Sequence, residues 1–232
     1  LKRLSSQLLV KQKAQAKSTY PTTLVVDVNG NLIVLGTTNS TNIIITPASG
    51  SQFRDASLNN GVGSENDGII QRFSNTGALQ WSTYLGGKKS EFIDGYNVHQ
   101  NDGIVTDKCG NFYVSLSTNS SDISIKQNGC NSFLDNNLTW NNDAYIAKFD
   151  KRCALKWGTF YGGQGSESPL AMALTPSSDL LAAGQSIDTA GFYTQYYLPS
   201  SFFSSQHFND TTADCYLLRF NQPTIDAGVT YS

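Results

Sequence analysis

The chain offers few residues that could carry catalysis. Its only histidines are His99 and His207, and neither lies near a nucleophile motif. A GxSxG elbow, an HExxH motif, a P-loop and a GxGxxG turn after a strand are all absent from the sequence. No two carboxylates stand out as the facing acid pair that glycoside hydrolysis needs. The sequence therefore predicts a protein that is not an enzyme.

The most regular chemical feature is a set of aspartates that recur at two kinds of position. They are Asp67, Asp143 and Asp214, which open predicted strands, and Asp27 and Asp107, which open predicted turns. Recurrence favours a structural role, because an active site is normally built once and a short Asp can fix a turn by accepting backbone N–H bonds. The alternative is Ca²⁺, since the asparagines before Asp67 and Asp143 add hard oxygens. No segment has the spacing of an EF-hand, so we expect no metal site.

The composition indicates which elements position these residues. The 232 residues contain 15% charged, 39% hydrophobic and 11% aromatic residues, with a net charge of −2. This balance excludes a disordered tail and a nucleic-acid module that works through a basic field. No run of about 18 apolar residues could span a membrane. The abundant Asn, Ser, Thr and Gly are typical of turn-rich β structure.

Internal repeats define the predicted elements. The stretch DGIIQRFSNTGALQWSTYLGG at 67–87 aligns without a gap with DAYIAKFDKRCALKWGTFYGG at 143–163. In this alignment Trp81 matches Trp157. A third, shorter copy begins at Asp214. A second unit reads VVDVNGNLIVLGTTNS from Val25 and VTDKCGNFYVSLSTNS from Val105, with a weaker copy from Ala173. Each unit reads as a β-hairpin, with the alternation of a strand and, in the copies at 67–87 and from Val25 and Val105, a Gly-containing turn.

Two hairpins in each period of about 70–76 residues indicate four-stranded units in tandem. Such units are typical of a β-propeller, whereas the coils of a solenoid are shorter and a sandwich would not explain the recurrence. We expect an all-β fold with about three blades, at 21–87, 102–163 and 169–222 of a propeller region spanning 21–222. A closed propeller needs at least four blades, so we expect a partial propeller or a fragment of a larger one.

The two ends are expected to differ from the repeats. Segment 1–20 reads as a degenerate partial hairpin, with a short basic helix as the alternative. Segment 223–232 reads as a linker to a following domain. The chain begins with Leu1 and not with Met, which favours processing or a piece of a longer protein.

The paired stretches DAYIAKFD…CALKWGTFYGG and DGIIQRFSNTGALQWSTYLGG, followed by VTDKCGNFYVS, resemble the SBBP-type β-propeller repeat. The resemblance covers most of 21–222. It departs at 173–188, which lacks the Gly-Asn turn, and at 214–223, which loses the Trp strand. Such repeats occur in large secreted and cell-surface bacterial proteins, including ones exported by the type IX secretion route, so the resemblance implies an extracellular or bacterial cell-surface location. The fold alone does not specify a function.

Three insertions separate the hairpins, at about 40–66, 120–142 and 187–213. In an up-and-down blade all three would gather on the face opposite the hairpin tips. Loops on a rigid scaffold often carry binding, and aromatic side chains grip sugars or protein partners. The candidate binding residues are Trp140, Tyr193, Tyr196, Tyr197 and Phe202, beside Phe53, Phe133 and Phe203. The alternative is that these aromatic side chains pack the loops onto the blades.

The same geometry suggests a pairing of the four cysteines. They have no CxxC spacing, which argues against zinc, and an even count favours an oxidising compartment. Cys109 and Cys153 both lie at predicted hairpin tips, whereas Cys130 lies in an insertion and Cys215 follows one. We therefore predict the disulfides Cys109–Cys153 and Cys130–Cys215.

The sequence favours a non-enzymatic interaction and scaffold module of a large secreted or surface protein, such as an adhesin or a fibre component. Its partners would be other domains of the parent protein or other surface proteins. One alternative is a propeller that binds or processes carbohydrate. Another is a propeller subunit of a multi-protein export or surface complex.

Overall fold

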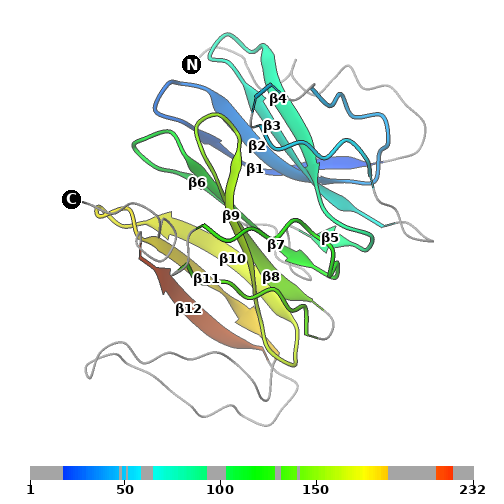
Figure 1. Cartoon of the computed structure of the whole chain (residues 1–232), viewed down its shortest axis with the longest axis vertical. Helices are drawn as coiled ribbons and strands as arrows, with labels where there is room; N and C mark the ends of the chain where they lie inside the picture. The colour runs from blue at the N-terminus through cyan, green and yellow to red at the C-terminus, as the bar shows by residue number, and fades with distance from the viewer. Residues whose placement is uncertain are drawn as a thin grey trace.

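The computed structural model describes residues 18–46, 49–50, 52–58, 65–92, 103–128, 132–139, 142–187 and 213–221. Within these ranges the chain is all-β, with three antiparallel sheets of three to five strands and no helix (Figure 1). The predicted all-β class is therefore confirmed. Nothing helical in this part of the chain is long and apolar enough to cross a membrane.

Each sheet is built from consecutive hairpins. The first sheet has the order β1 (Thr19–Val26), β2 (Leu32–Thr38), β3 (Asp67–Phe73) and β4 (Leu79–Leu85). In the second sheet, β7 (Phe112–Thr118), β8 (Asp143–Phe149) and β9 (Leu155–Tyr161) follow two short strands, β5 (Glu91–Phe92) and β6 (Ile104–Thr106), which both pair with β7. The third sheet has the order β10 (Glu167–Leu174), β11 (Leu180–Ser186) and β12 (Asp214–Phe220).

The turns explain why these hairpins form where they do. Gly30, Gly77 and Gly110 have φ values of +78°, +87° and +83°, a region that glycine enters without steric cost. The later copies use other residues there: Cys153 replaces Gly77 with φ +64°, and Ser178 replaces Gly30 with φ +68°. The turn geometry is therefore kept after the glycine has been lost.

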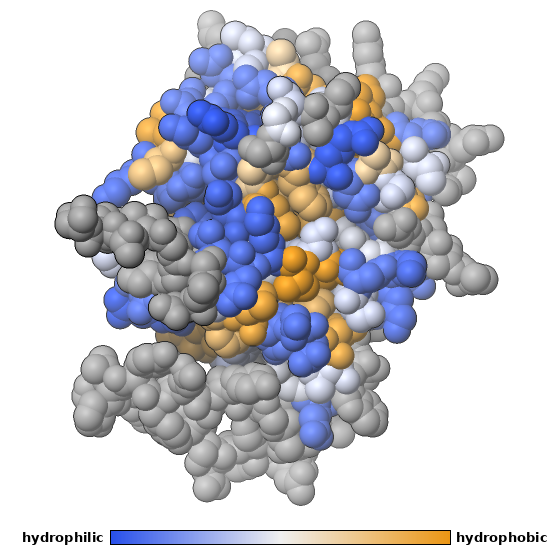
Figure 2. Space-filling view, in the orientation of Figure 1, coloured by the Kyte–Doolittle hydropathy of each residue, from blue (hydrophilic) through white to orange (hydrophobic). Residues whose placement is uncertain are grey.

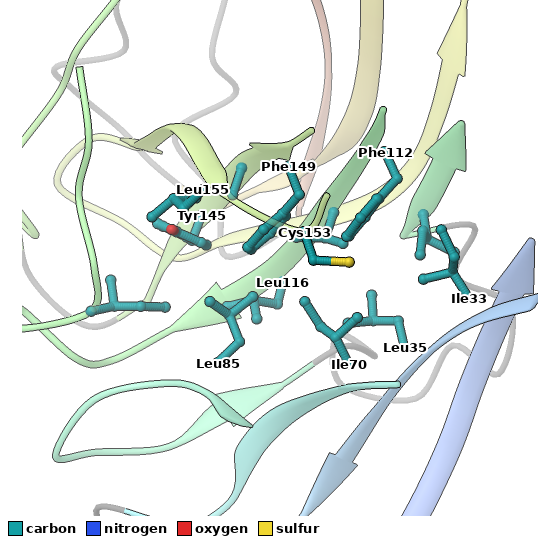
Figure 3. Packing of buried hydrophobic residues seen from close by; sticks show 14 of the residues in the cluster. Ile33, Leu35, Ile70, Leu85, Phe112, Leu116, Tyr145, Phe149, Cys153 and Leu155 are labelled. Atoms are coloured by element: carbon teal, nitrogen blue, oxygen red, sulfur yellow. The ribbon is translucent and has the colours of Figure 1, made fainter. Parts of the chain in front are cut away.

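The sheets pack face to face. One apolar cluster joins the inner face of the first sheet to the second: Ile33, Leu35, Ile70, Trp81 and Leu85 meet Ile104, Phe112, Val114, Leu116, Tyr145 and Phe149. Figure 3 shows the two rows of side chains pointing toward each other. A second cluster joins Tyr113, Ile146 and Trp157 to Met172, Leu180, Ala182 and Phe220 of the third sheet. The first strands of the sheets also touch, since β6 contacts both β1 and β10.

The described parts of the first two insertions do not stay on one face, as the sequence suggested for all three; the third lies almost entirely outside the described residues. Residues 52–55 run along the free edge of β4, where Tyr84 N–H donates to the Asp55 carbonyl over 3.2 Å. They reach the end of the sheets that carries the hairpin turns, where Phe53 N–H donates to the Cys153 carbonyl over 2.8 Å. The second insertion runs along the free edge of β9, where Phe160 N–H donates to the Asp135 carbonyl over 3.0 Å. The reason is that an edge strand presents unpaired backbone groups, and the insertions satisfy them.

Candidate functional site

The recurring turn aspartates organise the hairpin tips through their carboxylates. Asp27 Oδ1 accepts hydrogen bonds from the backbone N–H groups of Asn29 and Asn31, both over 2.9 Å. Asp107 accepts from Cys109 N–H and Asn111 N–H over the same distance. A carboxylate with several N–H donors fixes the path of a tight turn.

Arg72 extends the Asp27 turn into a contact between two sheets. Its Nη2 donates to Asp27 Oδ2 over 2.6 Å, and its Nη1 donates to the Lys151 carbonyl in the β8–β9 turn over 2.6 Å. Arg72 is only 8% exposed. Burial raises the pKa of Asp27, but hydrogen bonds from Asn31 and Asn29 and the Arg72 charge outweigh it and hold the pKa below its ordinary value. Arg72 therefore joins the first sheet to the second: its ion pair with Asp27 lies within the first sheet, and its hydrogen bond to Lys151 crosses to the second.

The third sheet keeps the ion pair with a rearranged turn. Arg219 occupies the place of Arg72, and its Nη2 lies 2.6 Å from Asp179 Oδ2. The aspartate has moved from the first to the last turn position, where Asn31 stands in the first sheet. The Arg219 side chain is 64% exposed. The third sheet thus keeps an ion pair between a basic residue and a carboxylate at this position.

The predicted Cys109–Cys153 disulfide is absent, because both residues are free thiols. Cys153 is 1% exposed and turns inward, with its Sγ 3.7 Å from Arg72 Nη1, whereas Cys109 is exposed. Burial raises the pKa of the Cys153 thiol, which makes it less reactive. Cys215 is also a free, exposed thiol, and its predicted partner Cys130 lies outside the described residues.

Two pairs of buried carboxyl groups lie at the other end of the strands, away from the hairpin turns. Asp67 and Glu91 are fully buried and flank Gly86, where an added Cβ would lie 2.5 Å from Glu91 Oε2 and 2.8 Å from Asp67 Oδ1. Asp143 and Glu167 repeat this arrangement around Gly162. The first pair links β3 to β5 and the second links β8 to β10, so each pair spans two neighbouring sheets. The glycine is required because the carboxyls occupy the space of a side chain.

Hydroxyl and amide donors hold the glutamates in place. Thr118 Oγ1 donates to Glu91 Oε1 over 2.8 Å, and Ser186 Oγ donates to Glu167 Oε1 over 2.7 Å. Burial and the Asp67 charge raise the pKa of Glu91 to about 8. Hydrogen bonds from Ser120 and Thr118 oppose this shift. A carboxyl with such a pKa could act as a general acid. Glu91 is fully buried between two sheets, however, and its environment recurs at Glu167, so we assign it to sheet packing.

The repeated tryptophans anchor the insertions. Trp81 Nε1 donates to the Phe53 carbonyl over 2.9 Å, and Trp157 Nε1 donates to the Phe133 carbonyl over 2.7 Å. Both indoles are fully buried. The Phe53 ring lies 5.8 Å from Phe149, edge to face, and Phe133 packs on the cluster of the third sheet. These two aromatic residues therefore pack their loops onto the sheets.

Several predicted site residues lie outside the described residues. They are the binding candidates Trp140, Tyr193, Tyr196, Tyr197 and Phe202, with Phe203 and the histidines His99 and His207. Asp214 begins β12, but its side chain is not described. In the described ranges, no group of three or more His, Cys, Asp or Glu residues could hold a metal ion. The surface seen in Figure 2 is mainly hydrophilic, with apolar side chains grouped near its middle.

The glutamates and the basic residues that join the sheets are not among the residues predicted from the sequence. The signal was present, since Gly86-Gly87 precedes Ser90-Glu91 at the spacing at which Gly162-Gly163 precedes Ser166-Glu167. Comparison with known proteins adds no assignment: no family model matches this chain, and no curated protein matches it.

Proposed function

We propose that the chain is a β-propeller segment of about three blades that serves as a non-enzymatic scaffold and interaction module of a large secreted or cell-surface bacterial protein. The observation that carries the proposal is the repeated contact between sheets. Trp81 lies 6.0 Å from Phe149 in the next sheet, and Trp157 lies 5.3 Å from Phe220, the residue equivalent to Phe149, in the sheet after it. A contact that recurs from sheet to sheet is what tandem blades require.

The arrangement of the first strands supports radial packing. β6 lies against both β1 and β10, so the three sheets approach one another along this side. In a propeller the first or last strands of all blades surround a common axis. Two kinds of polar link reinforce the contact: the recurring carboxyl pairs Asp67–Glu91 and Asp143–Glu167 at one end, and the Arg72–Lys151 hydrogen bond between the first two sheets at the other.

The insertions supply the interaction surface in this proposal. Their described parts are held by backbone bonds to β4 and β9 and by the two tryptophans. The binding candidates Trp140, Tyr193, Tyr196, Tyr197 and Phe202 belong to the second and third insertions. A rigidly mounted loop loses little entropy on binding, which favours recognition. The partners would be other domains of the parent protein, other surface proteins or glycans.

The test is to tag the protein in its own bacterial host and to treat intact cells with protease. The proposal expects a tag that is cleaved from intact cells or found in the medium, on a polypeptide much larger than 25.2 kDa. A tag protected inside intact cells would overturn the assigned location.

A glycan array separates the main proposal from a carbohydrate-binding propeller. Binding of one sugar class by the wild-type chain, lost in Trp140→Ala and Tyr197→Ala and retained in Phe53→Leu, would favour carbohydrate binding. Phe53→Leu is the matched control because Phe53 packs against the sheets and not toward solvent. Absence of glycan binding leaves protein contacts as the proposed role.

A further inference from the structure

The third sheet leaves open a position that is buried in the other two. Leu217 is the fourth residue of β12, as Ile70 is of β3 and Ile146 is of β8. Ile70 and Ile146 are fully buried between neighbouring sheets, whereas Leu217 is 74% exposed. The outward face of the third sheet therefore exposes, at Leu217, one of the two surfaces that meet in the recurring contact between sheets.

The first sheet exposes the opposite half. Leu24 pairs with Val34 in the register in which Ile104 pairs with Val114 and Met172 pairs with Ala182. Ile104 and Met172 are 4% and 6% exposed, and each packs on the preceding sheet, whereas Leu24 is 62% exposed. Val26, which lies on the same face of β1, is also exposed.

The two open positions match each other. Ile70 shares one apolar cluster with Ile104, and Ile146 shares the next with Met172. By the same register, Leu217 fits against a residue in the position of Leu24. One chain thus carries both halves of a contact that it already forms twice internally.

The ion pair beside this face supports the match. Arg72 is held by Asp27 and donates its second nitrogen to the Lys151 carbonyl of the next sheet. Arg219 is held by Asp179 in the same way, and its side chain is 64% exposed. In the first sheet the residue equivalent to Lys151 is Asn75, in the β3–β4 turn. A guanidinium on the open face of the third sheet would therefore find an equivalent carbonyl on another first sheet.

We propose that a second copy of this chain docks head to tail, with the third sheet of one copy on the first sheet of the other; this inference rests on the proposed propeller packing. The contact is heterologous, so successive copies close into a ring if the rotation allows it and otherwise extend into a fibre. The occupant is a second copy because both halves of the recurring contact are present in one sequence. Its central contacts are Leu217 against Leu24 and Arg219 against the Asn75 carbonyl.

Sedimentation velocity of the full chain tests the proposal from about 5 to about 500 µM. We expect the wild type to associate with rising concentration. Leu217→Asp and Leu24→Asp should each weaken association at least about tenfold, because each places a carboxylate in the apolar contact. Ile44→Asp is the matched control, since Ile44 is also 62% exposed but lies in the first insertion, where the second sheet has the polar Ser124. It should leave association unchanged.

Mixing the two variants gives the most specific result. Leu217→Asp keeps an intact first sheet, and Leu24→Asp keeps an intact third sheet, so an equimolar mixture should form a dimer that neither variant forms alone and that grows no further. A wild type that stays monomeric at about 500 µM, or a mixture without dimer, would overturn the head-to-tail contact. If the ring contacts of Trp81 and Trp157 persist in that monomer, the propeller proposal stands and only the docking fails. Their absence would remove both.

Discussion

The buried Glu91–Asp67 pair makes stability depend on pH in a direction that surface carboxylates do not share. The pKa of Glu91 is raised from 4.5 to about 8, so the folded chain binds a proton that the unfolded chain releases above pH 4.5. The stabilisation is fully present below pH 4.5 and is lost as the pH rises through about 8. Glu91→Gln removes this titration and keeps an oxygen that can accept from Thr118.

The size of the effect follows from the shift. At about 1.36 kcal/mol per pKa unit, full ionisation of Glu91 costs on the order of 5 kcal/mol in the folded chain. We therefore expect Glu91→Gln to be close to the wild type near pH 4.5 and to become more stable than it by about 3–5 kcal/mol near pH 9. The steepest change should be about 1.4 kcal/mol per pH unit, between these limits.

Urea unfolding of both proteins at half-unit steps of pH measures this difference. Glu65→Gln is the control, because Glu65 is a partly exposed glutamate in the segment that leads into Asp67. Because Glu65→Gln keeps Glu91, this variant should retain the loss of stability that the raised pKa of Glu91 causes as the pH rises. A Glu91→Gln protein that loses stability with rising pH as steeply as the wild type would refute the reasoning that burial beside Asp67 keeps Glu91 protonated in the folded chain.

Three further substitutions, with Arg219→Met and Trp140→Phe as comparisons, test other contacts of the sheets, and all are measured by chemical denaturation. Arg72→Met should cost about 2–4 kcal/mol, because it leaves the buried Asp27 carboxylate without its cation, whereas the exposed Arg219→Met should cost less than about 1 kcal/mol; equal losses would contradict the role of burial. Gly86→Ala should cost about 1–3 kcal/mol, since the new methyl group meets two carboxyls, and an unchanged midpoint would show that this end of the strands is open. Trp81→Phe should cost about 2–4 kcal/mol through the lost volume and the lost bond to the Phe53 carbonyl, and a smaller loss than in Trp140→Phe would contradict the anchoring role.

The repeats predicted the strands well because they recur with their apolar pattern intact. The gapless alignment of 67–87 with 143–163 placed two hairpins whose strands the structure has at the same positions. Trp81 and Trp157 also have equivalent surroundings, each donating to a phenylalanine carbonyl. Periodicity reports which face of a strand is buried, and here it recurs at each copy.

The course of the insertions could not be predicted from periodicity. In the described parts of the first two insertions the backbone follows the free edges of β4 and β9, because unpaired N–H and C=O groups there need partners, and the side-chain pattern does not report this need. The disulfide prediction failed for a related reason. Cys109 and Cys153 do share the hairpin-tip end, but the positive φ of Cys153 and its contact with Arg72 turn the thiol into the core. The position of a cysteine in the repeat predicts at which end of the sheet it lies, but it does not predict the direction of the side chain.

The central claim is that one contact between sheets recurs along the chain. The most direct measurement is nuclear Overhauser spectroscopy on the full chain with labelled aromatic residues. We expect cross-peaks between the rings of Trp81 and Phe149, 6.0 Å apart, and between those of Trp157 and Phe220, 5.3 Å apart. A folded chain that shows one of these pairs without the other would contradict it.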